Sequence, residues 1–292
     1  PIDQQREEAV SKRRIGLGIT GLADALIMCG VRYGSEEAVN LTKNWSRVLR
    51  DSAYRCSIDL AKEKGSFPLF VKEKFIENHN VKKLPKDLRA GIYSYGIRNA
   101  LLTSIAPTGT ISLLANNVSS GLEPVFAFKY NRKVLQSDGS SFIEPVSDYA
   151  LALFEKLKGK GENKTQAFVD AQTLQPNDHL VMQAAVQEYI DSSISKTINC
   201  PENIEFETFK AVYKSAYDLG CKGCTTYRPN DITGSVLSVD KGEHKSDKEL
   251  LPKEKSEEHE SIDDKPLVPL ERPEQLDGKT YKIKWPESDH AI

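Results

Sequence analysis

The chain has 292 residues, of which 39% are hydrophobic and 28% are charged, and its net charge is −2. This length suits one large domain or two smaller ones, and the near-neutral charge gives no basic field for a nucleic acid polymer. No apolar run approaches the ~20 residues that a membrane span requires, so a membrane protein is not expected.

The beginning of the chain is predicted to be helical. Residues 18–29 are mainly apolar and predict a short helix that ends at Gly30. Ser35 is a typical N-cap, because acidic residues follow it in what would be the first helical turn. Apolar residues then keep helical spacing to about Lys64, and Gly65 ends the pattern. A long helix is therefore expected between Ser35 and Lys64.

The centre of the chain contains the most informative pattern. An apolar run, Leu101–Ala106, breaks at Pro107, and an apolar segment resumes at Leu113. Small residues between them predict a strand that enters a tight turn and then a helix. Such a turn presents unpaired backbone N–H groups and hydroxyls at one point, which suits an anion such as phosphate. An ordinary junction capped by Thr and Ser explains the same pattern. The candidate anion-binding residues are Thr108, Gly109, Thr110 and Ser112.

The later part of the chain alternates between strand and helix patterns. Residues 125–136 are predicted to be extended, and polar loops are expected from there to Asn163. Helices are predicted at 181–189 and at 205–219, the second with an aromatic and apolar face. Residues 224–228 have the composition of a short strand. This alternation indicates an α/β layer or barrel with ligand groups at the strand ends.

The composition changes after Leu237. Residues 238–266 are rich in charges of both signs and lack aromatic residues, which predicts a flexible linker. The alternating segment Thr280–Trp285 then predicts the first hairpin of a small β-containing module at 267–292. The expected organisation is a domain at 1–237, this linker and the start of this module. Because the chain begins with proline and stops just after a strand pattern begins, it is expected to be an internal piece of a longer polypeptide.

Motifs for common cofactors and metals are weak. Gly16–Gly21 matches GxGxxG, but no buried strand precedes it, so a dinucleotide site is not expected. Cys221 and Cys224 have the spacing of a redox or half-zinc motif, but without a second pair no metal site is expected. A redox role and a structural role for them stay open. Cys29 and Cys56 have apolar neighbours and are expected to be small core residues. The odd number of cysteines, five, favours a cytoplasmic protein over a disulfide scaffold.

Two polar features are typical of either a site or a surface. Six polar residues lie between Ser192 and Asn199, and they would bind an anion or a sugar, or form a solvated loop. Glu123 lies in a loop framed by glycine and proline, where a carboxylate is either functional or caps a neighbouring element. Local chemistry does not separate these alternatives.

Six segments in this order resemble the large, catalytic chain of ribonucleotide reductases, most closely the adenosylcobalamin-dependent class. They are Arg13–Leu26, Leu60–Phe70, Ser104–Ser112, Ser119–Pro124, Ser193–Asn199 and Gly220–Asn230. The resemblance covers about residues 1–237, and Arg272–Ile292 is similar to the start of that class's C-terminal module. A single motif would be weak, but six in order are specific.

The resemblance implies the second half of a ten-stranded α/β barrel. It also implies reduction of the ribose 2′-hydroxyl of a ribonucleoside diphosphate through a cysteine thiyl radical, with adenosylcobalamin as cofactor. Tyr227 and Glu123 would lie close to the substrate or the cofactor. The residues that would hold the substrate's phosphates are Pro107, Thr108, Gly109, Thr110, Ile111 and Ser112.

The resemblance further implies what lies outside the chain. The family's Asn-x-Cys-x-Glu loop, which carries the thiyl cysteine, would precede Pro1, so no catalytic residue is expected here and the chain alone should be inactive. The implied partners are a ribonucleotide, the missing N-terminal half and a thioredoxin-like reductant, and a homodimer is compatible with the family. Two alternatives stay open: a metal-dependent reductase with a separate radical-generating subunit, and a non-catalytic phosphate-binding split subunit.

Overall fold

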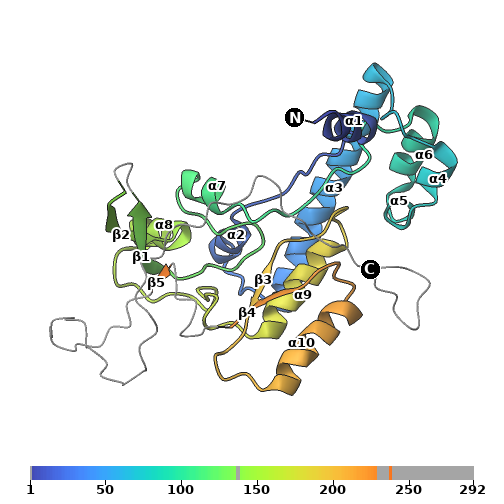
Figure 1. Ribbon diagram of the computed structural model, residues 1–292. Helices are drawn as coiled ribbons and strands as arrows, with labels where there is room; N and C mark the ends of the chain where they lie inside the picture. The colour runs from blue at the N-terminus through green and yellow to red at the C-terminus, as the bar shows by residue number, and fades with distance from the viewer. Residues whose placement is uncertain (1, 136–138, 229–236, 239–292) are drawn as a thin grey trace, which may run out of the picture. The chain divides into compact units, whose positions relative to one another are not determined.

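Helices dominate the part of the chain that the structure describes. The computed structural model describes residues 2–135, 139–228 and 237–238, within which the chain forms ten helices and five strands (Figure 1). These residues all belong to one unit by their contacts. The expected linker beyond Ser238 and the expected module at 267–292 lie outside the described residues.

Helix α3 (Glu36–Lys64) confirms the long helix predicted from the sequence. It begins where the Ser35 hydroxyl accepts a hydrogen bond from a first-turn amide at 3.1 Å. It ends at Gly65, whose φ of +77° suits glycine. The helix packs against α6 (Lys86–Tyr95) and α9 (Pro176–Gln187), so it connects two parts of the core.

Three short helices gather beside one end of α3 (Figure 1). They are α4 (Lys72–Ile76), α5 (His79–Lys82) and α6, and their core includes Phe67, Leu88 and Ile92. The sequence predicted none of them. The helices are only four to ten residues long, which gives a hydrophobic period too few turns to stand out.

The GxGxxG segment serves close backbone packing. It follows helix α1 (Asp3–Lys12), whereas a dinucleotide fingerprint follows a buried strand. Leu17 pairs with Thr103 in a parallel bridge. A Cβ atom on Gly18 would lie 2.3 Å from the carbonyl oxygen of Ser104, so this approach requires glycine. The glycine pattern is therefore explained by packing.

Helices α2 and α8 pack against each other and correct two predictions. Helix α2 (Leu22–Met28) starts later than predicted, after a glycine in the left-handed region. Helix α8 (Tyr149–Lys158) and strand β2 (Ser141–Ser147) before it lie where polar loops were expected, so that prediction is wrong. Asp148 caps α8 by accepting a hydrogen bond from the amide of Leu151 at 3.2 Å, and Ala150 is buried.

Two small sheets occur among the described residues. One has the strand order β2-β1-β5 and is antiparallel, and the other is the parallel pair β3-β4. The strands are β1 (Lys129–Leu135), β2 (Ser141–Ser147), β3 (Thr197–Asn199), β4 (Thr225–Tyr227) and β5 (Leu237–Ser238). Strands β1 and β4 confirm the extended segments predicted at 125–136 and 224–228. Strand β2 was missed because it is mostly exposed and has no alternating hydrophobic pattern.

Parallel pairing extends beyond the named strands. Ile105 forms a parallel bridge with Ile194, just before β3. Helix α10 (Phe206–Asp218) connects β3 to β4, as parallel strands require. The fold is therefore α/β, as predicted. The described strands form no closed sheet, so the ten-stranded barrel stays a prediction.

Helix α10 confirms the predicted helix at 205–219, but its predicted apolar face is only partly covered. Val212 and Ala216 are buried, whereas Phe206 and Tyr217 are 74% and 83% exposed. Helix α9 lies beside it and also contacts β3. Because α9 begins at Pro176, it starts earlier than the helix predicted at 181–189.

The surface corrects one further prediction. All five cysteines, each of which the structure describes, are free thiols. Cys29 and Cys56 are exposed, so the prediction that they are core residues is wrong. Cys29 follows the last turn of α2, and Cys56 lies on the outward side of α3. Apolar neighbours in sequence do not share a face of a helix.

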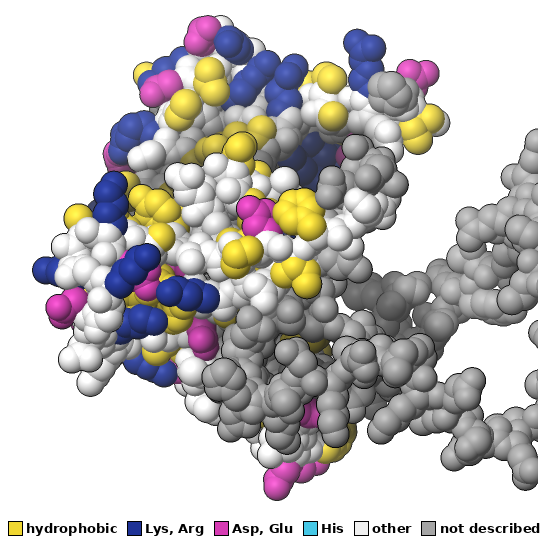
Figure 2. Space-filling model, turned by 90° about the vertical axis from the view of Figure 1, so that its left-hand side faces the viewer, with side chains coloured by type: hydrophobic (Ala, Val, Ile, Leu, Met, Phe, Trp, Pro, Cys, Tyr) yellow, Lys and Arg dark blue, Asp and Glu magenta, His cyan; other side chains and the backbone are white. Residues whose placement is uncertain are grey.

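The face drawn in Figure 2 carries Lys and Arg side chains mainly toward its periphery, with hydrophobic and a few acidic side chains near its centre. This mixture is in keeping with the net charge of −2. In the described part of the chain, no helix is both long and apolar enough to cross a membrane.

Candidate functional site

A cavity of about 630 Å³ brings together most of the residues that the sequence singled out. Small-molecule sites have volumes of roughly 300–1,000 Å³, so the cavity has a suitable size for a ligand. Three residues of the predicted anion-binding turn do not line the cavity, namely Pro107, Thr108 and Ile111. The predicted residues that line it are Gly109, Thr110, Ser112, Glu123 and Tyr227.

The predicted anion-binding turn starts a helix, as expected. Helix α7 (Gly109–Leu114) follows Thr108, whose left-handed backbone with φ of 52° turns the chain sharply. The first helical hydrogen bond runs from the amide of Ser112 to the carbonyl of Thr108 at 2.8 Å, so the three amides before Ser112 have no partner within the helix. With six residues, α7 has only a small dipole, so anion binding here would depend on these amides and nearby hydroxyls.

Thr20, from the glycine-rich segment, holds the turn in place. Its Oγ1 lies 2.6 Å from Ser112 Oγ and donates to the carbonyl of Ser119 at 2.9 Å. Thr108 Oγ1 donates to Thr20 Oγ1 at 3.2 Å. Ser112 is 2% exposed, so its hydroxyl stabilises the turn from inside. Thr110 is exposed and lines the cavity, so its hydroxyl is available to a ligand.

The loop Ser119–Pro124 forms the wall beside the turn. Its first amide donates a hydrogen bond to Asp24 Oδ2 at 2.6 Å. Gly121 has φ of +53°, and a Cβ atom there would lie 2.8 Å from the carbonyl oxygen of Ala106. Glycine therefore lets the loop approach the start of the turn. This approach carries Glu123 to the cavity.

Glu123 is held by two hydrogen bonds from the segment that forms β3. Its Oε1 accepts one from the amide of Thr197 at 2.6 Å, and its Oε2 accepts one from Nζ of Lys196 at 2.7 Å. Burial lowers the pKa of Lys196, and the Glu123 carboxylate opposes this shift. The Lys196 side chain is 0% exposed, so the alternative of a solvated loop at 192–199 is wrong for this residue. The sequence could not reveal this, because the partner lies 73 positions away.

His179, on the first turns of α9, lies next to Lys196. Its Nδ1 is 2.9 Å from Lys196 Nζ. Burial, and then the Lys196 charge, lower the pKa of His179 to about 3, so the ring is neutral.

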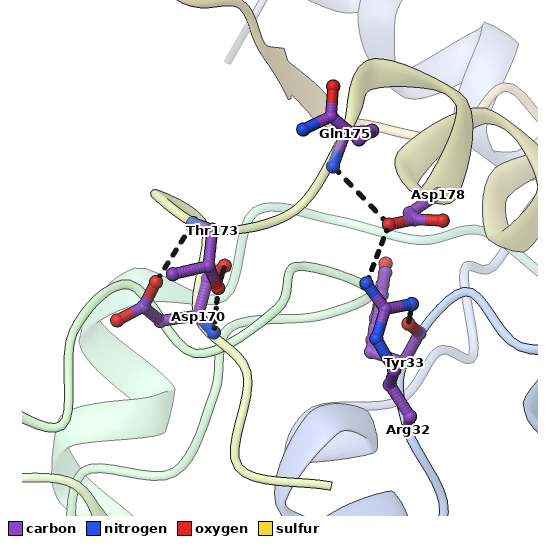
Figure 3. A network of polar contacts seen from close by, with 6 residues as sticks. All are labelled: Arg32, Tyr33, Asp170, Thr173, Gln175 and Asp178. Atoms are coloured by element: carbon purple, nitrogen blue, oxygen red, sulfur yellow. Dashed lines mark hydrogen bonds and ion pairs between the residues drawn. The ribbon is translucent and has the colours of Figure 1, made fainter. Parts of the chain in front are cut away.

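Figure 3 shows how the start of α9 is fixed: Asp178 accepts hydrogen bonds from the amide of Gln175 at 3.3 Å and from Arg32 at 3.1 Å.

Two buried carboxylates lie at another part of the wall. Asp148 lines the cavity and is 3% exposed, and Asp24 is 1% exposed. Burial, and then the Asp24 carboxylate, raise the pKa of Asp148 to about 7. The pair was not predicted, because Asp24 lies on α2 and Asp148 lies just before α8, far apart in the sequence.

Tyr227 lines the cavity at the end of β4 and is 43% exposed. Its carbonyl accepts a hydrogen bond from the amide of Cys200 at 2.8 Å. Cys221 and Cys224 pack with buried Cys200 in the small core around α10, which favours a structural role for them. Among the described residues, no three His, Cys, Asp or Glu lie together so that they could hold a metal ion.

Comparison with known proteins shows the family of the chain. Residues 1–227 match the family model of the ribonucleotide reductase barrel domain. The chain is 34% identical over 257 residues to a vitamin B12-dependent ribonucleoside-diphosphate reductase of Mycobacterium tuberculosis (strain ATCC 25618 / H37Rv), covering 82% of this chain and 34% of that protein. It is 32% identical over 265 residues to a protein of the same name from Thermoplasma acidophilum, covering 85% of this chain and 32% of that protein. The chain thus spans about a third of the length of these relatives.

Proposed function

Because the chain belongs to the family of the ribonucleotide reductase barrel domain, we propose that it is part of a vitamin B12-dependent ribonucleoside-diphosphate reductase and binds the phosphates of the substrate. The proposed reaction is reduction of the ribose 2′-hydroxyl through a cysteine thiyl radical. No cysteine is among the described residues that line the cavity, so the thiyl cysteine would come from a part of the enzyme outside this chain.

The observation that carries the proposal is the joint presence of the turn, Glu123 and Tyr227 around one cavity of nucleotide size. The amides of residues 109–111 would donate to phosphate oxygens, and the exposed hydroxyl of Thr110 would add a further donor. Pro107 has no N–H and precedes the sharp bend. Arg132 is the only Lys or Arg among the described lining residues, and its guanidinium would balance the phosphate charge.

Glu123 and Tyr227 would serve the uncharged parts of the nucleotide. A carboxylate repels phosphate, so Glu123 would accept hydrogen bonds from the sugar or the base. The Tyr227 ring offers an apolar surface and a hydroxyl that can donate or accept a hydrogen bond. The phosphates would therefore lie toward α7, and the nucleoside would lie toward these two side chains.

The names of the relatives imply a cobalamin, and we propose the adenosyl form. The described lining residues include no His or Cys that could bind cobalt. A cavity of about 630 Å³ suits a nucleotide, whereas a corrin ring with its side chains is much larger. The lining of this cavity therefore does not fit the cofactor, and we assign the cofactor's site to other parts of the enzyme. Glu123 and Tyr227 are accordingly assigned to the substrate alone.

The remaining parts of the proposal concern partners and organisation. A thioredoxin-like reductant would restore the enzyme after each turnover in the cytoplasm, and the N-terminal half of the barrel would complete the site. A homodimer is compatible with this arrangement. Residues 1–237 would form the barrel half, 238–266 a linker and 267–292 the start of a further module.

The test of the proposed function is substitution of Gly109 in the complete reductase. A Cβ atom at Gly109 would have nothing within 4 Å, so Gly109→Asp and the control Gly109→Ala should both fold. We expect Gly109→Asp to weaken binding of a ribonucleoside diphosphate and of inorganic pyrophosphate at least ~10-fold, because the new charge repels phosphate. Gly109→Ala should change either affinity by less than about threefold, well under 1.4 kcal/mol. Unchanged affinities for Gly109→Asp, measured by calorimetry, would refute the assignment.

A second measurement separates the classes of reductase. Activity of the complete protein is compared with and without adenosylcobalamin. Activity that depends on the cofactor supports the proposal, and activity that instead requires a second, radical-generating protein supports the metal-dependent alternative. Nucleotide binding without reduction under either condition supports a non-catalytic subunit.

A further inference from the structure

Lys196 is a buried cation whose three N–H donors all have acceptors. Its Nζ lies 2.7 Å from Oε2 of Glu123, 2.9 Å from Nδ1 of His179 and 3.1 Å from the carbonyl oxygen of Thr197. A lysine ammonium carries three donors and no acceptor, so the set of partners is complete. This completeness indicates that Lys196 is charged in spite of its burial.

The contact with His179 is compatible with this charge state. An ammonium can only donate, so Nδ1 of His179 accepts, and the ring proton lies on Nε2. The low pKa of His179 keeps the ring neutral, so it adds no positive charge beside Lys196. Its Nε2 is buried and has no hydrogen-bond partner among the described residues. The ring is therefore oriented so that Nδ1 bonds to Lys196 while Nε2 is left without a hydrogen bond.

An ion pair with a buried lysine is a weak source of stability, because the cost of removing the charge from water often exceeds the attraction between the two groups. An apolar side chain of similar length would fill the space occupied by Lys196. Stability therefore does not explain why an ammonium is buried beside a cavity, and the group that it contacts explains it better. That group is Glu123, whose side chain is 28% exposed and lines the cavity.

Glu123 has acceptor capacity left after these contacts. Each of its oxygens receives one hydrogen bond from the protein, whereas a carboxylate has about four lone-pair sites. No other donor to this carboxylate is found among the described residues, so its remaining lone pairs are free for a ligand. A phosphate would be repelled, so the ligand group must be a neutral hydrogen-bond donor.

We propose that Lys196 is a positioning residue, which holds the Glu123 carboxylate in one orientation so that it accepts a hydrogen bond from a ribose hydroxyl or a base amino group. This inference rests on the proposed function, since it takes a nucleotide as the ligand. It goes beyond that function in assigning the specificity for the nucleoside part to a residue that does not line the cavity. His179 completes the arrangement by fixing the ammonium from the other side.

The test uses a double-mutant cycle in the complete reductase, with ribonucleoside diphosphate, ribose 5-phosphate and inorganic pyrophosphate as probes. We expect Lys196→Met and Glu123→Gln each to weaken nucleotide binding ~10-fold, since a hydrogen bond to a charged group contributes ~1.5 kcal/mol or more. Pyrophosphate affinity should change by less than about twofold, since it lacks the donor that Glu123 binds. The double variant should bind the nucleotide as Glu123→Gln does, because Lys196 acts through Glu123. Weaker ribose 5-phosphate binding identifies a hydroxyl as the donor, and an effect on the nucleotide alone identifies the base.

The matched control is Lys43→Met, which removes the surface ion pair of Lys43 with Glu188 and should change no affinity. The inference is overturned if Lys196→Met leaves nucleotide affinity unchanged while Gly109→Asp lowers it, and the proposed function then stands. It is also overturned if the double variant binds more weakly than Glu123→Gln, a comparison that holds even if Lys196→Met alone does not fold. If Gly109→Asp changes neither nucleotide nor pyrophosphate binding, the proposed function itself fails.

Discussion

Asp24 and Asp148 bind consecutive amides at the start of helix α8. Oδ1 of Asp24 accepts a hydrogen bond from the amide of Ala150 at 2.9 Å, and Oδ1 of Asp148 accepts one from the amide of Leu151 at 3.2 Å. Burial raises the pKa of Asp148 to about 7, and the neighbouring Asp24 carboxylate adds to this shift, because two carboxylates at one helix end do not both ionise easily. Asp148 at the helix start therefore keeps its proton up to about pH 7.

The first prediction concerns the pH dependence of stability. The pKa of Asp148 rises from its ordinary value of 3.8 to about 7 in the folded chain. Between these two pH values, the folded chain therefore binds one proton that the unfolded chain has lost. The free energy of unfolding should therefore fall as pH rises from about 4 to 7, by on the order of a few kcal/mol. Asp148→Asn keeps an oxygen for the cap and should remove this part of the slope. Urea denaturation at several pH values measures both.

The control for this prediction is Asp59→Asn. Asp59 is exposed on α3 and pairs with Lys62, so its substitution should leave the slope as it is in the wild type. Equal slopes for the wild type and Asp148→Asn would show that Asp148 binds no extra proton in the folded chain between about pH 4 and 7.

The second prediction concerns the glycine-rich segment. A Cβ atom on Gly18 would lie 2.3 Å from the carbonyl oxygen of Ser104, which is a backbone atom and cannot rotate away as a side chain would. Gly18→Ala should lower the free energy of unfolding by ~1–3 kcal/mol, the usual cost of overpacking. Gly223→Ala is the matched control, because a Cβ atom there meets nothing within 4 Å. Equal denaturation midpoints for the two variants would contradict the close approach.

Local signals explain which parts of the fold were predictable. Ser35 and Gly65 gave the two ends of α3, because caps act on their own helix. The turn before α7 was predictable for the same reason, because Pro107 and Gly109 are residues that mark turns. Strand β2 was missed because an exposed strand leaves no period in hydrophobicity. Its pairing with β1 depends on the partner rather than on its own residues.

The third prediction concerns the thiols. Cys29 and Cys56 are exposed, whereas Cys200 is buried and burial raises its pKa, which lowers the fraction of reactive thiolate. In the native chain, a thiol reagent should label Cys29 and Cys56 within the first minutes and Cys200 only on unfolding. Mass spectrometry after timed labelling measures this order, and denatured protein, in which all cysteines react, is the reference. Labelling of Cys200 as fast as Cys29 would contradict its burial.

The candidate site was predictable only in part for a related reason. Thr110 and Glu123 were singled out from turn residues around them. Lys196 was recognised as a cation in a polar segment, but its burial follows from Glu123 and His179, which come from other segments. Asp24 gave no signal at all, because a single acidic residue in a helix is usually exposed. Long-range partners therefore decided what local patterns could not.

The hydroxyls of Thr20 and Ser112, 2.6 Å apart, are separated by 92 positions in the chain. This separation has a consequence for the order of folding. Helices such as α3 form from local contacts, but the cavity exists only after loops of this length have closed, which is slow. A nucleotide that binds only the finished cavity would stabilise the folded chain by ~2.7 kcal/mol at a concentration 100 times its Kd. Protection from proteolysis by the nucleotide should therefore extend to the distant glycine-rich segment as well as to the turn that it touches.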